Sequence, residues 1–296
     1  MGLMSYLYDI AFIGHMCFDE IEPFEGTVSV APGSAVLCGA LAAARVGKSV
    51  VIVTRMALQD QSILKSLRQN GVADHIIPSA ETTYMKVVHP SADVDDRQIY
   101  QLTNAGLFSL ADMPHLTVRR VHLAGITNQE FDLDFIRGLK RQGYHLSVDM
   151  QSFVRQVQPD TGLIEFLDVP EKMEIARLVD MVKLDIVEAR VLTGTGDLAQ
   201  AAEIIEAWGC REVVITQADG VLARVNGQTY YEKFTNRSVV GRTGRGDTTF
   251  AAYLARRLDH DPAEALKFAS ALVSIKMEAP GPFHGTLDEV LARMGE

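Results

Sequence analysis

Residues 240–250 read Val240-Gly241-Arg242-Thr243-Gly244-Arg245-Gly246-Asp247-Thr248-Thr249-Phe250. Glycine tolerates positive φ and lets another group approach the backbone closely, so Gly244 and Gly246 favour a loop whose N–H groups turn toward one point. The residues that follow carry apolar side chains at helical spacing, which places this loop at a helix N-terminus, where the macrodipole favours an anion. The stretch therefore predicts a phosphate cradle.

Asp247 stands at the junction of the loop and the helix, and two interpretations fit it. As an N-cap, its carboxylate accepts hydrogen bonds from the first-turn amides of the helix. As a general base, it accepts the proton of a substrate hydroxyl while the glycine N–H groups stabilise the phosphoryl group being transferred. The two roles are compatible with each other.

Size and composition restrict the classes of protein to consider. The chain has 296 residues, of which 47% are hydrophobic, so it has enough apolar residues for a sizeable core. A formal net charge of −10 argues against a nucleic-acid partner and against an anionic membrane surface. The three cysteines, Cys17, Cys38 and Cys210, are too few and too scattered for a disulfide framework. With no basic leader and no run of about 18 apolar residues, we expect a cytoplasmic protein that acts on small molecules.

Residues Gly241 to Asp247 resemble the C-terminal signature of the ribokinase-like (PfkB) carbohydrate kinases, Asp-Thr-x-Gly-Ala-Gly-Asp. The resemblance extends in the right order over nearly the whole chain. It implies an α/β fold of the ribokinase-like three-layer α/β/α type, with a mostly parallel central sheet and a small β-sheet lid, in a single domain over residues 1–296. The catalytic residues that it implies are Asp247 as the base, with Gly244, Arg245 and Gly246 as the cradle.

The signature differs from that of the family in residues that bear on charge. Gly241 and Arg242 stand in place of Asp-Thr, and Arg245 stands in place of Ala. In many relatives the lost Asp helps to bind a monovalent cation, so its absence puts activation by potassium in doubt. Arg242 or Arg245 is a candidate for supplying the missing positive charge. A guanidinium stays protonated and can donate two parallel hydrogen bonds to phosphate oxygens. The alternative is two solvated arginines.

The expected acceptor site begins after a short apolar run at residues 10–14, which reads as a buried strand. In the family an Asp after this strand holds substrate hydroxyls, and Asp19 falls at that place; a solvated turn Asp is the alternative. The following segment resembles the N-terminal signature Gly-Gly-x-x-x-Asn. Gly33 is retained, whereas Ser34 replaces the second glycine and Cys38 stands where Asn commonly touches the sugar.

A second acceptor segment follows the strand at residues 145–149. It contains Gln151 and Arg155, and it resembles both the Asp-x-Asn stretch of the family and the Val-Asp-x-Gln-x-Phe-x-Arg pattern of the branch that phosphorylates myo-inositol. Both side chains can donate hydrogen bonds to hydroxyls or phosphates; an exposed polar loop is the alternative. The resemblance thus assigns the substrate to Asp19, Gly33, Cys38, Gln151, Arg155 and Asp247.

Residues 82–103 have the pattern of a β-hairpin, with a polar turn at residues 91–96. Together with residues 20–31, this segment resembles the β-lid of the family, which closes over the sugar and often pairs between subunits. The resemblance therefore implies that a homodimer can form through the lid. A surface hairpin without function is the alternative.

Asp185 and Glu188 are three residues apart at a predicted helix start, so they share one helix face. Two such carboxylates can organise a hydrated Mg²⁺, and the Asn-x-x-Glu motif of the family does so at this place. A capping arrangement is the alternative. The resemblance also implies that ATP lies along Lys183, Thr216, Gly220, Thr243, Gly244, Gly246 and Ser274.

The expected reaction is transfer of the γ-phosphoryl group of ATP to a hydroxyl of a sugar or a cyclic polyol resembling myo-inositol. A nucleoside kinase of the same fold is one alternative. The other is a regulatory protein that binds nucleotide or sugar without catalysis, although a pure binder has no chemical need for Asp247. A dinucleotide-dependent oxidoreductase fits the sequence poorly, because the first strand is not followed by the glycine fingerprint that a dinucleotide site needs.

Overall fold

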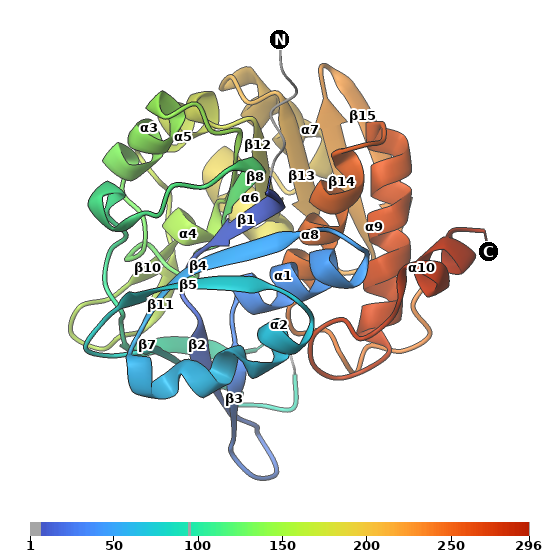
Figure 1. Ribbon diagram of the computed structural model, residues 1–296. Coiled ribbons are helices and arrows are strands. Elements are labelled where there is room, and N and C mark those ends of the chain that lie inside the picture. The colour runs from blue at the N-terminus through green and yellow to red at the C-terminus, as the bar shows by residue number, and fades with distance from the viewer. Residues whose placement is uncertain (1–6, 94–95, 296) are drawn as a thin grey trace.

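The computed structural model describes residues 7–93 and 96–295 (Figure 1). Residues 1–6, positions 94 and 95 of the expected hairpin turn, and residue 296 lie outside the described residues. A nine-stranded sheet forms the centre of the molecule, in the order β15-β14-β13-β12-β9-β8-β1-β4-β5. Its strands are β1 (Tyr8–Ile13), β4 (Val50–Met56), β5 (Ala73–Pro78), β8 (Val118–Leu123), β9 (Leu146–Asp149), β12 (Met181–Asp185), β13 (Glu212–Thr216), β14 (Gly220–Val225) and β15 (Gln228–Lys233).

Helices cover both faces of this sheet, as alternation along the strands requires. In β1, Ile10 and Phe12 belong to one core cluster, whereas Ala11 and Ile13 belong to the other. The first cluster includes residues of α1 (Ala35–Arg45), α2 (Lys65–Gln69), α8 (Arg245–Arg257), α9 (Pro262–Met277) and α10 (Leu287–Met294). The second includes residues of α3 (Leu133–Arg141), α4 (Gln151–Val154), α5 (Lys172–Leu178), α6 (Ile186–Thr193) and α7 (Leu198–Ala207). The expected three-layer α/β/α architecture is confirmed.

The strands from β13 to β5 run parallel, so their carboxyl ends meet at one edge of the sheet. Asp149, Asp185 and Thr216 are the last residues of β9, β12 and β13 at this edge. The antiparallel pair β14 and β15 extends the sheet through a turn with φ of 49° at Asn226 and 82° at Gly227. Two positive φ values are typical of the type I′ turn that Asn-Gly predicts.

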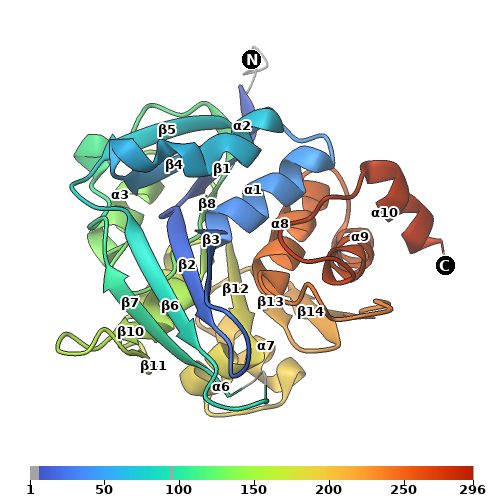
Figure 2. The same cartoon turned by 90° about the horizontal axis from the view of Figure 1, so that it is seen from below.

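A separate four-stranded sheet forms the lid, in the order β3-β2-β6-β7. Its strands are β2 (Cys17–Glu22), β3 (Ser29–Gly33), β6 (Thr83–Val88) and β7 (Gln98–Thr103), and they lie side by side, away from α9 and α10 (Figure 2). The lid thus begins a few residues earlier than the sequence indicates. Asp19 lies on a strand, not in a turn, and Phe24, Val28 and Val30 are about half exposed on the β2–β3 segment. A homodimer through this sheet stays a prediction.

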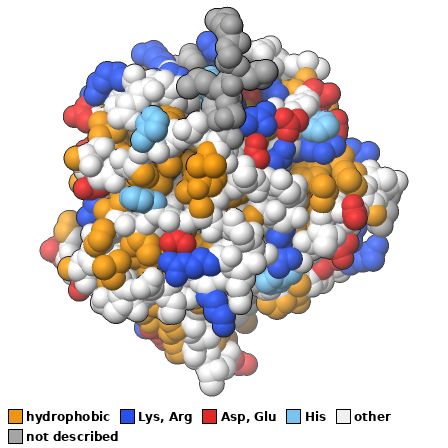
Figure 3. All heavy atoms as spheres, viewed as in Figure 1, with side chains coloured by type: hydrophobic (Ala, Val, Ile, Leu, Met, Phe, Trp, Pro, Cys, Tyr) orange, Lys and Arg blue, Asp and Glu red, His pale blue; other side chains and the backbone are white. Residues whose placement is uncertain are grey.

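Two shorter features complete the described chain. A small hairpin of β10 (Arg155–Val157) and β11 (Ile164–Phe166) lies beside β7, and two 3₁₀ helices span Leu58–Leu64 and Leu110–Asp112. On the face in Figure 3, acidic and basic side chains are interspersed with apolar ones. Among the described residues, no helix combines the length and the apolar character that crossing a membrane requires.

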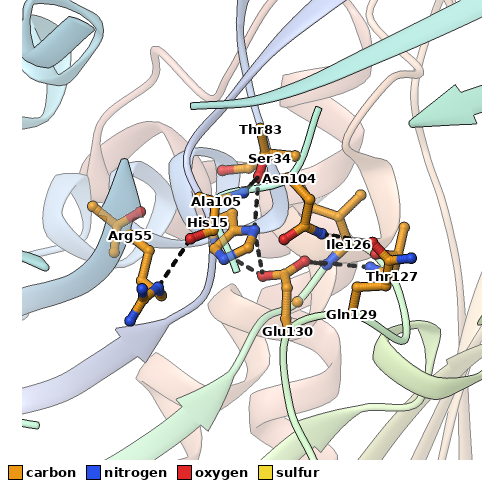
Figure 4. A network of polar contacts seen from close by, with 12 residues as sticks. His15, Ser34, Arg55, Thr83, Asn104, Ala105, Ile126, Thr127, Gln129 and Glu130 are labelled. Atoms are coloured by element: carbon orange, nitrogen blue, oxygen red, sulfur yellow. Dashed lines mark hydrogen bonds and ion pairs between the residues drawn. The ribbon is translucent and has the colours of Figure 1, made fainter. Parts of the chain in front are cut away.

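A buried polar network joins the base of the lid to the central sheet (Figure 4). The carboxylate of Glu130 accepts hydrogen bonds from the backbone N–H groups of His15 at 2.8 Å, Ile126 at 2.5 Å and Thr127 at 3.3 Å. The His15 ring contacts the Gly106 carbonyl through Nε2 at 2.9 Å, so this nitrogen donates. Its Nδ1 then accepts from the Thr83 hydroxyl, at 2.8 Å. The network spans the chain segments that enter and leave the lid.

We expect Glu130→Gln to lower the free energy of unfolding by about 1–3 kcal/mol, because an amide satisfies fewer of the buried N–H donors than a carboxylate does. Urea unfolding followed by circular dichroism measures the change. Glu171→Gln is the matched control, since Glu171 is exposed. Equal unfolding midpoints for the two variants would contradict this role of Glu130.

Candidate active site

The glycine-rich loop leads directly into α8, as the sequence predicts. Gly244 is the N-cap residue of this helix, with φ of 75°, and a Cβ on it would lie 2.5 Å from the Sγ of Cys38. The position therefore requires glycine for both its conformation and its close approach to α1. Asp247 lies in the first turn, so the N-cap interpretation of Asp247 is wrong. Helical geometry leaves the first-turn amides without carbonyl partners inside the helix, which suits an anion.

Lys183 connects Asp247 to the central sheet. Its Nζ lies 2.7 Å from Oδ2 of Asp149 and 3.7 Å from Oδ1 of Asp247, and the Lys183 side chain is only 3% exposed. Burial lowers the pKa of Lys183, but Asp149, Glu188 and Asp247 together outweigh burial and raise it. The same nitrogen would lie 3.2 Å from a Cβ at Gly246, so the ammonium borders the cradle. A permanent positive charge thus stands between the strand ends and the loop.

Asp19 faces this group from the lid. Burial raises its pKa, and the charge of Asp247 raises it further, while the hydrogen bond from Cys17 and the charge of Arg155 lower it. The Sγ of Cys17 donates to Oδ1 of Asp19 at 3.3 Å. Gly33 lies against the same carboxylate, since a Cβ there would be 1.8 Å from Oδ2. The charges of Asp247 and Arg155 thus both act on the Asp19 carboxylate of the lid.

Cys38 lies on α1 between these groups and the cradle. Burial raises the pKa of its thiol to about 12, with a further contribution from Asp247. The side chain is consequently a neutral thiol, with little capacity to hold a hydroxyl by hydrogen bonding. Its Sγ instead packs against Gly244.

Gln151 and Arg155 come from the segment that follows β9. Gln151 is 6% exposed, and its Nε2 donates to the carbonyl of Gly125 at 3.1 Å. Arg155 Cζ lies 5.5 Å from the ring centroid of Phe166, and its Nη2 lies 3.7 Å from Oε1 of Glu188. The exposed-loop alternative is wrong for Gln151, which is buried. Arg155 brings the acceptor segment into contact with the predicted metal ligands.

Asp185 and Glu188 form a reciprocal capping box at the start of α6. The Oδ1 of Asp185 accepts from the Glu188 N–H, and Oε2 of Glu188 accepts from the Asp185 N–H, both at 2.8 Å. Burial, with the charge of Asp185, raises the pKa of Glu188 to about 8. The capping alternative is confirmed, but it uses only one oxygen of each carboxylate.

Several polar atoms at this site remain for a ligand. Within residues 7–93 and 96–295, the buried Oε1 of Glu188, Nε of Arg155 and Oγ1 of Thr248 lack a hydrogen-bond partner. The same residues include no cluster of three or more His, Cys, Asp or Glu side chains that could hold a metal ion. A Mg²⁺ ion needs fewer protein ligands, because it keeps several waters and takes oxygens from phosphates. The carboxylate oxygens of Asp185 and Glu188 therefore fit a hydrated Mg²⁺.

The residues predicted to bind nucleotide do not all lie at the cradle. Thr216 lies with the cradle, since a Cβ at Gly246 would be 3.5 Å from its Oγ1. Gly220 packs against the Tyr231 hydroxyl. Ser274 is fully buried; its Oγ donates to the Ser270 carbonyl at 2.6 Å and accepts from the Thr235 N–H at 2.8 Å. Thr243 is exposed in the loop before α8. A contact between nucleotide and these residues stays a prediction.

Sequence reasoning missed two residues of this region. Asp149 marks a strand end in the sequence, but its buried pair with Lys183 depends on the register of β9 and β12. Lys276 directly follows a run of small and apolar residues at 268–275 of α9. It is 2% exposed, and its Nζ donates to the carbonyls of Gly241 and Thr243. A charged residue at the end of a buried run was the available signal.

Comparison with known proteins agrees with this arrangement. The chain is 32% identical to a pyrophosphate-dependent kinase of the ribokinase family in a sulfate complex, with a TM-score of 0.89 over 96% of this chain and 99% of that one. It is 31% identical to a pyrophosphate-dependent kinase complexed with a pyrophosphate analogue and myo-inositol, with a TM-score of 0.87 over 96% and 99% of the two chains. A cytidine kinase from Thermococcus kodakarensis is 25% identical over 260 residues, which cover 84% of this chain and 88% of that protein.

The family model described as pfkB family carbohydrate kinase matches residues 7–288. This match includes both the lid and the α8 loop with Asp247. The fold is therefore ribokinase-like, and the chain belongs to the PfkB family of carbohydrate kinases, phosphotransferases that use an alcohol group as acceptor.

Proposed function

We propose that this protein transfers a phosphoryl group from pyrophosphate to a hydroxyl of a cyclic polyol of the myo-inositol type. The observation that carries the chemistry is the position of Asp247, which lies in the first turn of α8, beside the cradle and 3.7 Å from Lys183. A carboxylate next to an anion site supplies a base and a binding site for the transferred group within one helical turn.

In this proposal the acceptor hydroxyl lies between Asp19 and Asp247. Asp247 removes its proton as the acceptor oxygen forms a bond to phosphorus, and the bond from that phosphorus to the bridging oxygen of the donor breaks. The amides of Gly244, Gly246 and Asp247 and the ammonium of Lys183 stabilise the charge on the transferred group, whereas the Arg245 N–H donates to the Arg242 carbonyl at 3.1 Å. Gln151 and Arg155 donate to the remaining hydroxyls, and Gly33 leaves Asp19 room on the lid side.

Arg245 supports pyrophosphate over the expected ATP as the donor. It replaces the Ala of the family signature, and its Nη1 donates to the Ala218 carbonyl at 3.2 Å. The side chain thus reaches from the cradle to the loop before Gly220, where the resemblance would place the nucleotide. A guanidinium in this position adds a positive charge and a forked donor that suit phosphate oxygens. The two pyrophosphate-dependent kinases described above are 31% and 32% identical to this chain.

Asp185 and Glu188 would hold Mg²⁺ in this proposal, with Glu188 Oε1 as the buried oxygen without a hydrogen-bond partner among the described residues. When bound, the ion neutralises charge on the donor phosphates. Arg155, at 3.7 Å from Glu188, orients that carboxylate from the acceptor side. The similarity to a cytidine kinase keeps a nucleoside acceptor as the second candidate, so nucleosides belong in the same assay.

We expect Asp247→Asn to lower kcat by about 10²- to 10⁴-fold, because the amide cannot accept the hydroxyl proton. The assay follows phosphorylated product from pyrophosphate or ATP with myo-inositol, sugars and nucleosides. Asp288→Asn, on the exposed side of α10, is the matched control. Turnover by Asp247→Asn at the wild-type rate would exclude Asp247 as the base. Binding of donor with no turnover of any acceptor by the wild type would favour a regulatory binding protein.

Arg245→Ala tests the donor. Hydrogen bonds to charged groups contribute about 1.5–3 kcal/mol, which corresponds to about a 10- to 100-fold loss of kcat/KM for pyrophosphate. We expect a smaller loss for ATP, and so a shift in donor preference. Arg141→Ala, an exposed arginine on α3, is the control. An unchanged KM for pyrophosphate would remove Arg245 from the donor site.

Glu188→Gln separates the metal role from the capping role. Glutamine also completes a capping box, so the helix start is retained while the charge is lost. We expect the Mg²⁺ concentration for half-maximal activity to rise roughly 10-fold or more, with little change in the thermal unfolding midpoint. A lower midpoint with an unchanged Mg²⁺ requirement would identify Glu188 as a cap alone.

A further inference from the structure

Lys276 is a buried lysine that contacts the cradle loop. It lies in the last turn of α9, and its ammonium donates to two carbonyl oxygens of the loop before α8, those of Gly241 and Thr243. Only 2% of the residue is exposed. The catalytic proposal above does not use it.

Main-chain atoms fix the loop against the end of α9 at the same point. The Gly241 N–H donates to the Met277 carbonyl at 2.9 Å. A Cβ on Gly241 would lie 1.8 Å from the carbonyl oxygen of Ala279 and 2.8 Å from that of Lys276, so only glycine fits here. Carbonyl oxygens from the loop and from the helix end therefore gather around one small volume, and they give it a negative potential.

A positive charge suits this volume for electrostatic reasons. The C-terminus of a helix favours cations, and carbonyl dipoles are oxygen ligands that suit a bare cation. The pKa of Lys276 is lowered, first by burial and further by the charge of Arg245, while the neighbouring Cys38 and Asp247 act in the opposite direction. The Lys276 ammonium thus interacts electrostatically with Asp247 and with Arg245 of the cradle.

We propose that Lys276 is a positioning residue that acts as a built-in monovalent cation. Its ammonium holds the carbonyls of Gly241 and Thr243 on one side of the loop, so that the amides of Gly244, Gly246 and Asp247 face the donor phosphate on the other side. The reaction then needs no potassium. This inference rests on the proposed function, because a fixed loop would increase the rate of phosphoryl transfer.

The first test compares the wild-type rate in potassium, ammonium and tetramethylammonium chloride at equal ionic strength. We expect the same rate in all three salts. Strong activation by potassium would overturn the proposal, because it would require a second cation site. If no acceptor supports turnover, the proposed function fails in this assay, and the unfolding measurements below still test the role of Lys276.

Two substitutions at Lys276 distinguish a cation from a structural side chain. Lys276→Ala leaves the two carbonyls without a cation and opens a volume beside them. We expect kcat to fall about 10²-fold in tetramethylammonium, because a small misplacement of reacting groups lowers the rate by about that factor. Potassium or ammonium should restore most of this loss. Lys276→Met fills the volume without charge, so we expect the loss to persist in every salt. Lys267→Ala, on the exposed side of α9, is the control.

The remaining outcomes are also decisive. Full activity of Lys276→Ala in tetramethylammonium, or a folded Lys276→Ala variant that no cation restores, would overturn the proposal. Thermal unfolding is measured in parallel in the same salts. We expect potassium to raise the midpoint of Lys276→Ala and to leave those of the wild type and Lys276→Met unchanged. Equal midpoints of Lys276→Ala in potassium and tetramethylammonium would contradict the inference even if the variants were inactive for other reasons.

Discussion

The arrangement of the site depends on one buried ammonium, that of Lys183 on β12. Its contact of 2.7 Å with Asp149 joins two neighbouring parallel strands, and its second carboxylate partner, Asp247, belongs to α8. Breaking such a pair leaves an uncompensated buried charge, which costs several kcal/mol, so the three groups constrain one another. The sheet edge and the first turn of α8 are thereby held in a fixed relation. Asp247 cannot be displaced without also disturbing the core of the sheet.

The two sides of the site are built in different ways. Under the proposed function, the phosphate side consists of backbone amides, glycines and lysines on the main sheet and its helices. The acceptor side would take Asp19 and Gly33 from the lid, whose base is connected through His15 and Glu130. The polar groups of this connection are paired with each other and buried, so the lid base has a defined position relative to the sheet. The binding groups are thus divided between the main sheet with its helices and the smaller sheet of the lid.

Local patterns in the sequence were sufficient for most of the fold. Apolar runs at strand length, Asn226-Gly227 and the capping pair Asp185 and Glu188 each determine their structure over a few residues, and those predictions are confirmed. The glycine-rich loop could also be placed before its helix. What could not be predicted depends on residues far apart in the chain. The pairing of Asp149 with Lys183 depends on strand register, and the carbonyl contacts of Lys276 depend on how α9 meets the cradle loop.

The proximity of Asp19 and Asp247 bears on product release. Burial raises the pKa of Asp19, and the charge of Asp247 adds to this rise. Under the proposed function, an uncharged polyol brings hydroxyl donors to these two carboxylates. After phosphoryl transfer, the same carboxylates face an ester that carries negative charge of its own, and like charges repel. The groups that hold the substrate therefore help to expel the product, and an acceptor that already carries a phosphate meets the same repulsion as it enters.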